Sequence, residues 1–119
     1  MEITWQATGH LAPRHGIDRP ADRDAIAASM AEDGWQGAPV VIDDRAFDGE
    51  GGYLITGNHR HDAAIAAGLG TIPCVTLADL CEAAGIDLNA YCDGSYDSEW
   101  TAVLAELPAE VRDVYGIQF

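Results

Sequence analysis

The most constraining feature of this sequence is an apolar strand that runs into a glycine and then into a helix. Residues 53–56 (Tyr-Leu-Ile-Thr) have the composition of a buried strand, whereas residues 58–67 are rich in alanine and end before Gly68. Gly57 stands between the two segments, where its conformational freedom permits a sharp turn. We therefore expect an α/β fold built around this strand, turn and helix.

Two further apolar segments predict strands that complete a small mixed sheet. Residues 38–42 (Ala-Pro-Val-Val-Ile) are expected to pair with residues 53–56 as a hairpin with a long polar tip. Residues 71–76 predict the next strand after the helix, in a strand-helix-strand order of the βαβ type. Near the start, a short half-buried strand is predicted from alternate apolar residues at Ile3, Trp5 and Ala7.

Helical spacing of apolar residues occurs before and after these strands. Residues 23–33 predict a helix that Asp22 caps and Gly34 ends. The last third of the chain predicts two helices, at 78–84 and 98–107. The second of these carries an apolar stripe, expected to pack on the rest of the chain or on a partner, at Trp100, Val103, Leu104 and Leu107.

Size and charge limit the organisation and the partners of the chain. At 119 residues it is expected to be a single domain, with a core at 11–77 and an acidic helical extension at 78–119. The 20 acidic residues outnumber the six arginines and the formal net charge is −14, so non-specific DNA binding is disfavoured. The acidic extension is interpreted as serving solubility or, alternatively, as binding a protein partner.

No segment indicates secretion or a membrane location. The start (Met-Glu-Ile-Thr-Trp) lacks a basic region followed by an apolar stretch, and no apolar run reaches the roughly 20 residues that span a bilayer. The cysteines lack the paired spacing of a zinc site and are interpreted as reduced thiols, at Cys74, Cys81 and Cys92. Cys74 is expected to be buried in an apolar strand. Together these features predict a cytoplasmic protein.

The turn at residues 57–60 (Gly-Asn-His-Arg) combines groups that suit an anion. The first amides of a helix have no intrahelical acceptors and lie at the positive end of the helix dipole. Arg60 adds a charged fork of donors that suits phosphate oxygens, and His59 can donate from its ring. Asn58 can cap the helix or donate its amide to a ligand.

A structural interpretation of the same turn is also open. In it, Asn58 only caps the helix and Arg60 pairs with a nearby acid such as Asp62. His59 and His61 are then solvated residues of the first turn. Residue chemistry alone does not decide between this interpretation and an anion site.

The order of the predicted elements resembles the ParB/sulfiredoxin superfamily over residues 11–77. In that pattern a helix ending in acid-x-Gly, here residues 32–34, precedes a Pro-Val strand, here 39–42. A Tyr-x-Ile strand then leads into Gly-x-x-Arg at 57–60, followed by an alanine-rich helix and an Ile-Pro strand at 72–73. The resemblance implies a compact α/β domain with a small mixed sheet.

The resemblance also implies a ligand, because members of the superfamily bind nucleotides through the Gly-x-x-Arg turn. Partition proteins bind and hydrolyse CTP, and sulfiredoxins use ATP to activate a cysteine sulfinate. By this resemblance Gly57, His59 and Arg60 bind nucleotide phosphate, and Ser29 is similar in position to a sulfiredoxin hydroxyl near the nucleotide. The implied cofactor is ATP or CTP with Mg²⁺, and the implied activity is NTP hydrolysis or phosphotransfer.

Departures from the superfamily leave the catalytic residues unassigned. Residues 57–60 are similar to the sulfiredoxin Gly-Cys-His-Arg, but Asn58 replaces the attacking cysteine and is not a practical nucleophile. The Gly-Glu-Arg-Arg form of the partition proteins is absent, as are their helix-turn-helix and dimerisation regions. Sulfiredoxin activity and centromere binding are therefore not expected.

Two other functions stay open at this stage. One is a catalytically inactive adaptor that binds a protein through the acidic extension or the apolar stripe. The other is a ParB-like nuclease, which needs clustered metal ligands of the kind that could come from His10, His15, His59 and His61. For phosphoryl transfer, the candidate metal or base residues are acids near the two helix starts, at Asp22, Asp24 and Asp62.

Overall fold

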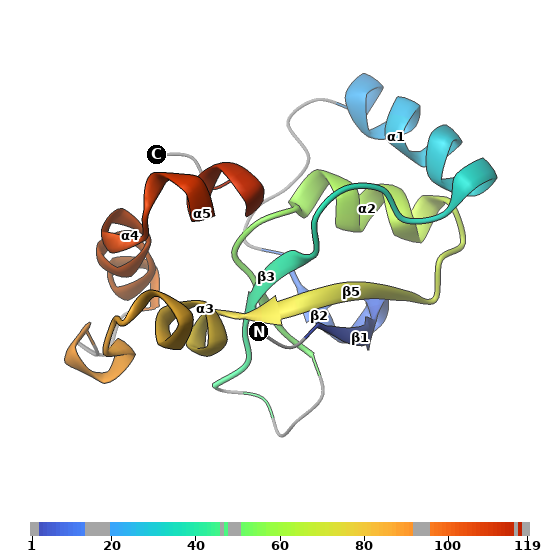
Figure 1. Cartoon of the computed structure of the whole chain (residues 1–119). Helices are drawn as coiled ribbons and strands as arrows, with labels where there is room; N and C mark the ends of the chain where they lie inside the picture. Colours follow the sequence, from blue (N-terminus) through green and yellow to red (C-terminus); the bar gives the residue numbers. More distant parts are fainter. Residues whose placement is uncertain are drawn as a thin grey trace.

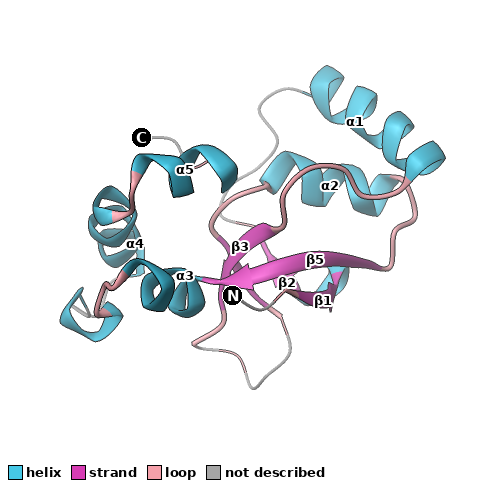
Figure 2. Cartoon of the chain, viewed as in Figure 1, coloured by secondary structure: helices cyan, strands magenta, loops and turns pink. Residues whose placement is uncertain are grey.

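The computed structural model describes residues 3–13, 20–45, 47, 51–91, 96–115 and 117. In these residues the strands are β1 (Thr4–Ala7), β2 (Leu11–Ala12), β3 (Val40–Asp43), β4 (Gly52–Leu54) and β5 (Thr71–Thr76). The α-helices are α1 (Pro20–Asp33), α2 (Asn58–Ala66), α3 (Leu77–Ala84), α4 (Tyr96–Glu106) and α5 (Ala109–Tyr115), with 3₁₀ helices η1 (Thr8–His10) and η2 (Leu88–Tyr91). Figure 1 shows how they are arranged, and Figure 2 separates helices from strands. The α/β class expected from the sequence is confirmed.

The five strands form one mixed sheet in the order β1-β5-β3-β4-β2. β3 and β4 pair antiparallel with Ile42 opposite Leu54, which confirms the predicted hairpin. β3 pairs parallel with β5, so β4 and β5 run in opposite directions and the segment from β4 to β5 is not a parallel βαβ unit. The predicted strand-helix-strand order along the chain is confirmed as β4, α2 and β5, but these two strands do not pair, because β3 lies between them.

Alternation along β3 divides the core between the two faces of the sheet. Val40 and Ile42 face α1 and α2, and pack in one cluster with Met30 of α1 and Ala63 of α2. The two helices lie next to each other on this side of the sheet (Figure 1). Val41 points to the opposite face and belongs to a second cluster.

The second cluster holds the C-terminal helices against the sheet. α3 contributes Leu77 and Leu80 to it, α4 contributes Trp100, Val103 and Leu104, and Leu107 follows directly after α4. The stripe therefore packs inside the protein, as the first of the two expectations had it, and it is not a surface for a partner. The proposed division between residues 11–77 and 78–119 stays a prediction.

Other features of the fold also differ from the sequence expectations. β2 lies in a segment with no predicted strand and pairs parallel with β4; two residues are too few to show a periodic pattern. α5 was not predicted either. β1 forms as predicted and lies at the edge of the sheet, but Ile3 and Trp5 are 53% and 62% exposed. They are exposed because α3 packs on the more central strands β3 and β5. The prediction of a half-buried apolar face was wrong at these two residues.

Candidate functional site

Gly57 makes the turn between β4 and α2. It has φ 80°, and a Cβ at this position would lie 2.4 Å from Cγ1 of Val40. The preceding residues are tied to β3, since the Ile55 amide donates to the Val41 carbonyl (2.8 Å) and the Val41 amide donates to Oγ1 of Thr56 (3.0 Å). Both backbone conformation and space therefore require glycine here.

The start of α2 is arranged differently from the capped start that the sequence allowed. Gly57 is the N-cap residue and has no side chain to accept a hydrogen bond, while Asn58 is already the first helical residue. Asn58 is 7% exposed, so its side chain is buried at the turn and is not solvated. The first-turn amides have no intrahelical acceptors, which is the geometry that favours an anion at a helix start.

The guanidinium of Arg60 lies against the loop that joins α1 to β3. Its Nη1 donates to the carbonyl of Ala38 at 2.7 Å and to that of Gln36 at 3.5 Å. Its Cζ lies 4.9 Å from the centroid of the Trp35 ring. Arg60 is thus surrounded by residues 35–38 (Trp-Gln-Gly-Ala), which we call the 35–38 loop. The pairing with Asp62 suggested by the structural interpretation is wrong, because Asp62 binds Arg23 instead.

The charge of Arg60 is not balanced by a carboxylate within the described part of the chain. Among the described residues, Arg23 pairs with Asp24 and Asp62, and Arg45 pairs with Asp43, but no ion pair involves Arg60. Burial lowers the pKa of the Arg60 guanidinium. Burying a charge is unfavourable unless it is paired, so a partly buried cation next to a helix start favours an anionic ligand.

The two histidines in the first turn of α2 have different surroundings. His61 is 5% exposed, and its Nε2 donates to the Thr8 carbonyl at 2.7 Å, which ties α2 to η1. The structural interpretation, in which His61 is solvated, is therefore wrong. Nε2 of His59 is buried and has no hydrogen-bond partner among the described residues. Because an unpaired buried nitrogen is unfavourable, His59 is a second group at this turn that a ligand could satisfy.

Ser29 contacts the same loop as Arg60. It lies on α1, and its Oγ accepts a hydrogen bond from Nε2 of Gln36 at 2.7 Å. The carbonyl of Gln36 accepts from Arg60, so one residue of the loop touches both side chains. The role of Ser29 toward a nucleotide stays a prediction.

Comparisons with known proteins establish the fold. No protein-family model and no curated protein matches the sequence. A sulfiredoxin structure from Arabidopsis thaliana has 23% identity and a TM-score of 0.53, over 64% of this chain and 84% of that one. A C-terminally truncated chromosome-partitioning protein ParB from Caulobacter crescentus, complexed with CTP-gamma-S, has 15% identity and a TM-score of 0.56, over 98% and 85%. The chain has a ParB/sulfiredoxin-like fold.

Within this ParB/sulfiredoxin-like fold, two of the candidate metal or base acids are already engaged. Arg23 binds both Asp24 and Asp62, which links α1 to α2. The side chain of Asp22 and the whole of His15 lie outside the described residues. In the described part, no three His, Cys, Asp or Glu residues form a group that could hold a metal ion.

The sequence interpretation missed Asp43, a carboxylate buried on the opposite face of the sheet. It is 1% exposed and accepts hydrogen bonds from Nη2 of Arg45 (2.7 Å) and Nε1 of Trp100 (2.8 Å). Burial acts to raise the pKa of Asp43, but the hydrogen bonds from Arg45 and Trp100 outweigh it and hold the pKa below its ordinary value. Because side chains alternate along a strand, the position of Asp43 two residues after Val41 indicates the face on which it lies. The sequence did not indicate its partner Trp100, which is 57 residues away.

The described cysteines are unsuited to the chemistry of a sulfiredoxin. Cys74 and Cys81 are free and buried. Burial raises the pKa of Cys74 to about 11, so its thiol is protonated at neutral pH. The prediction that Cys74 is a buried apolar residue is confirmed.

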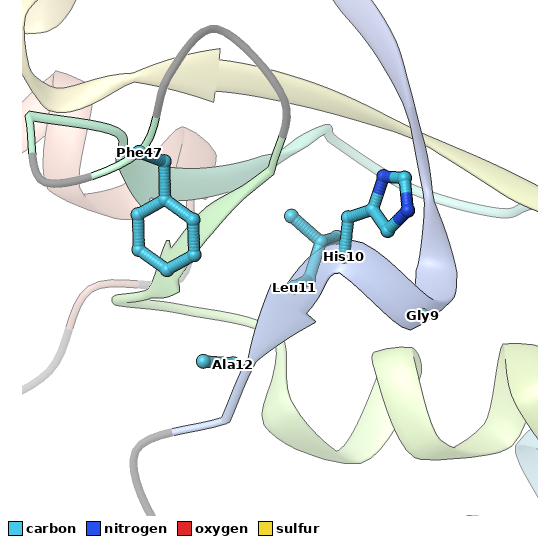
Figure 3. Close-up of a pocket in the computed structure, with 5 residues that line it drawn as sticks. All are labelled: Gly9, His10, Leu11, Ala12 and Phe47. Atoms are coloured by element: carbon cyan, nitrogen blue, oxygen red, sulfur yellow. The ribbon is translucent and has the colours of Figure 1, made fainter.

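A cavity of about 340 Å³ lies beside η1 and β2, apart from the turn at residues 57–60. Figure 3 shows its lining residues, with Phe47 across from the chain that carries Gly9, His10, Leu11 and Ala12. None of the predicted site residues lines it. His10, considered above as a metal ligand, is the one histidine in its described lining.

Proposed function

We propose that this chain binds a nucleoside triphosphate, with the phosphates held by the turn at Gly57, Asn58, His59 and Arg60 and by the first amides of α2. The observation that carries the proposal is the partly buried Arg60 guanidinium, which has no carboxylate partner among the described residues. A phosphate at the helix start would supply the missing negative charge. The likeness in fold to a ParB complexed with CTP-gamma-S supports a nucleotide as the source, with ATP and CTP as the first candidates.

Magnesium enters this proposal as the companion of the triphosphate. Mg²⁺ in nucleotide sites is commonly bound by phosphate oxygens and water, with one or two protein carboxylates. Among the described residues, Asp24 and Asp62 are occupied by Arg23, and no cluster of three ligands is present. The side chains described thus fit a phosphate anion better than a metal held by the protein alone.

We propose NTP hydrolysis or phosphotransfer as the activity to be tested at this site. Both reactions depend mainly on positioning and on neutralising phosphate charge, which is what Arg60 and the helix start would supply. Asn58 offers no attacking group, so the acceptor would have to be water or a second substrate. No residue is assigned as catalytic.

We propose a cytoplasmic location from the state of the described cysteines. Free thiols at Cys74 and Cys81 fit a reducing compartment. In the described part of the chain, no helix is long and apolar enough to cross a membrane. A protein partner would bind exposed acidic residues of the C-terminal helices, such as Glu82, Glu106 and Glu110, because the apolar stripe is buried.

The test is calorimetric titration of ATP, CTP, GTP and ADP with magnesium into the wild type, Arg60→Gln and Arg23→Gln. We expect saturable binding by the wild type and a loss of about tenfold to a hundredfold in Arg60→Gln, the range for a charged hydrogen bond. Arg23→Gln removes the same charge from an arginine already paired with two acids, so its affinity should stay within about threefold. No binding of any nucleotide by the wild type would overturn the proposal and favour the adaptor.

A further inference from the structure

Trp35 lies where α1 passes into the 35–38 loop, and its ring contacts the guanidinium of Arg60. The distance from Cζ of Arg60 to the ring centroid is 4.9 Å, within the range of a cation–π interaction. Trp35 also packs against the core cluster that faces α1 and α2. Its Nε1 is buried without a hydrogen-bond partner among the described residues, so the face of the ring makes the specific contact here, not its N–H group.

We infer that Trp35 is a positioning residue that holds Arg60 in place for the phosphates, an inference that rests on the proposed function. Nη1 of Arg60 is taken up by the carbonyls of Gln36 and Ala38. Nη2 lies on the side of the helix start, 3.6 Å from the place of a Cβ on Gly57. One nitrogen of the fork is therefore anchored in the loop while the other lies beside the N-cap of α2.

An aromatic ring suits this task better than a carboxylate would. A free arginine side chain has many rotamers, and ordering it on ligand binding reduces affinity. A carboxylate partner would order the guanidinium but would also cancel the charge that attracts phosphate. The ring of Trp35 and two main-chain carbonyls order it and leave its positive charge uncancelled.

The inference is tested by a double-mutant cycle between positions 35 and 60, with magnesium-ATP and magnesium-CTP affinity as the measured quantity. Trp35→Leu removes the ring and should weaken binding roughly threefold to tenfold. Trp35→Phe keeps an aromatic face and should stay within about twofold of the wild type. In an Arg60→Gln background, Trp35→Leu should have no further effect, because there is no guanidinium left to position.

Trp5→Leu is the matched control, since it makes the same change at a tryptophan that is 62% exposed on β1. It should leave the affinity unchanged. If Trp35→Leu does not fold, Trp35→Met takes its place, because the flexible methionine side chain adapts to irregular gaps in a core and also lacks a ring. The free energy of unfolding of each variant is measured without ligand, so that a general loss of structure is recognised.

The outcomes separate this inference from the proposed function. A wild type that binds no nucleotide overturns both. A wild type that binds, with Trp35→Leu equally harmful in the presence and absence of Arg60, overturns the positioning role alone. Binding that is weakened in Trp35→Leu, kept in Trp35→Phe and insensitive to position 35 once Arg60 is gone supports the inference.

Discussion

Arg45 and Arg60 lie on opposite faces of the same sheet and are held in opposite ways. Arg45 forms a forked ion pair with the buried Asp43, which in turn accepts a hydrogen bond from Trp100 of α4. Arg60 is held by two carbonyls and an aromatic ring, and no carboxylate of the described chain reaches it. The charge of Arg45 is neutralised by Asp43, whereas the positive charge of Arg60 has no negative partner among the described residues.

The difference indicates what each face does. The buried carboxylate of Asp43 is neutralised by Arg45, and its hydrogen bond from Trp100 fastens α4 to β3 without a ligand. An unbalanced guanidinium at a helix start has little structural value for the empty protein, but it gains a favourable partner when an anion binds. The Asp43 side of the sheet thus has a stabilising role, and the Arg60 side is where we propose the ligand site.

The largest expected effect is the loss of stability in Arg45→Ala. The change leaves the carboxylate of Asp43 buried without its cation, so we expect the free energy of unfolding to fall by about 3 kcal/mol. Urea denaturation measures this loss. Asp43→Asn in the same chain should restore part of it by removing the buried charge. A double variant no more stable than Arg45→Ala would contradict the account of Asp43.

The next largest effect is expected at the turn beside Arg60. Gly57→Ala should lower the free energy of unfolding by about 2–3 kcal/mol, because the new methyl group meets Val40 and the backbone has φ 80°. Gly68→Ala is the control, since Gly68 has φ 81° but nothing within 4 Å of its Cβ position. It should cost about 1 kcal/mol. Equal losses in the two variants would show that the contact with Val40 is unimportant.

A smaller effect is expected when Arg60 itself is changed. Arg60→Gln should alter the free energy of unfolding by less than about 1 kcal/mol without ligand, since it removes an unbalanced charge together with the contacts that hold it. Thermal unfolding in the absence of nucleotide measures the change. A loss as large as that of Arg45→Ala would mean that both arginines are structural.

The smallest effect is a dependence of stability on acid pH. The folded pKa of Asp43 lies below its ordinary value of about 3.9, so the unfolded state binds a proton more readily. Its contribution to stability is present above about pH 4 and is lost as the pH falls through the folded pKa. Asp43→Asn should therefore show a flatter profile of unfolding free energy between about pH 5 and pH 3. Parallel profiles for the variant and the wild type would contradict this.

Local pattern was sufficient for most of the elements around the site. The segment 71–76, predicted as a strand, is β5, and the helix expected from Asn58 or His59 to Ala67 is α2, Asn58–Ala66. These elements are marked by apolar periodicity, alanine content and glycine at the turns, all of which act between residues close in sequence. The order of these elements over residues 11–77 predicted a ParB/sulfiredoxin-like fold, and the structural comparisons confirm it.

The sequence by itself thus determined the strand, the glycine turn and the helix start that carries Arg60. Only the tertiary structure decided which groups meet there and which stay exposed: Arg60 binds a carbonyl 24 residues away, His61 binds Thr8, and Asp43 binds Trp100. It also left Trp5 exposed at the edge of the sheet. The physical reason is that backbone conformation depends on neighbouring residues, whereas burial and charge pairing depend on the strand order and on which helices cover each face of the sheet.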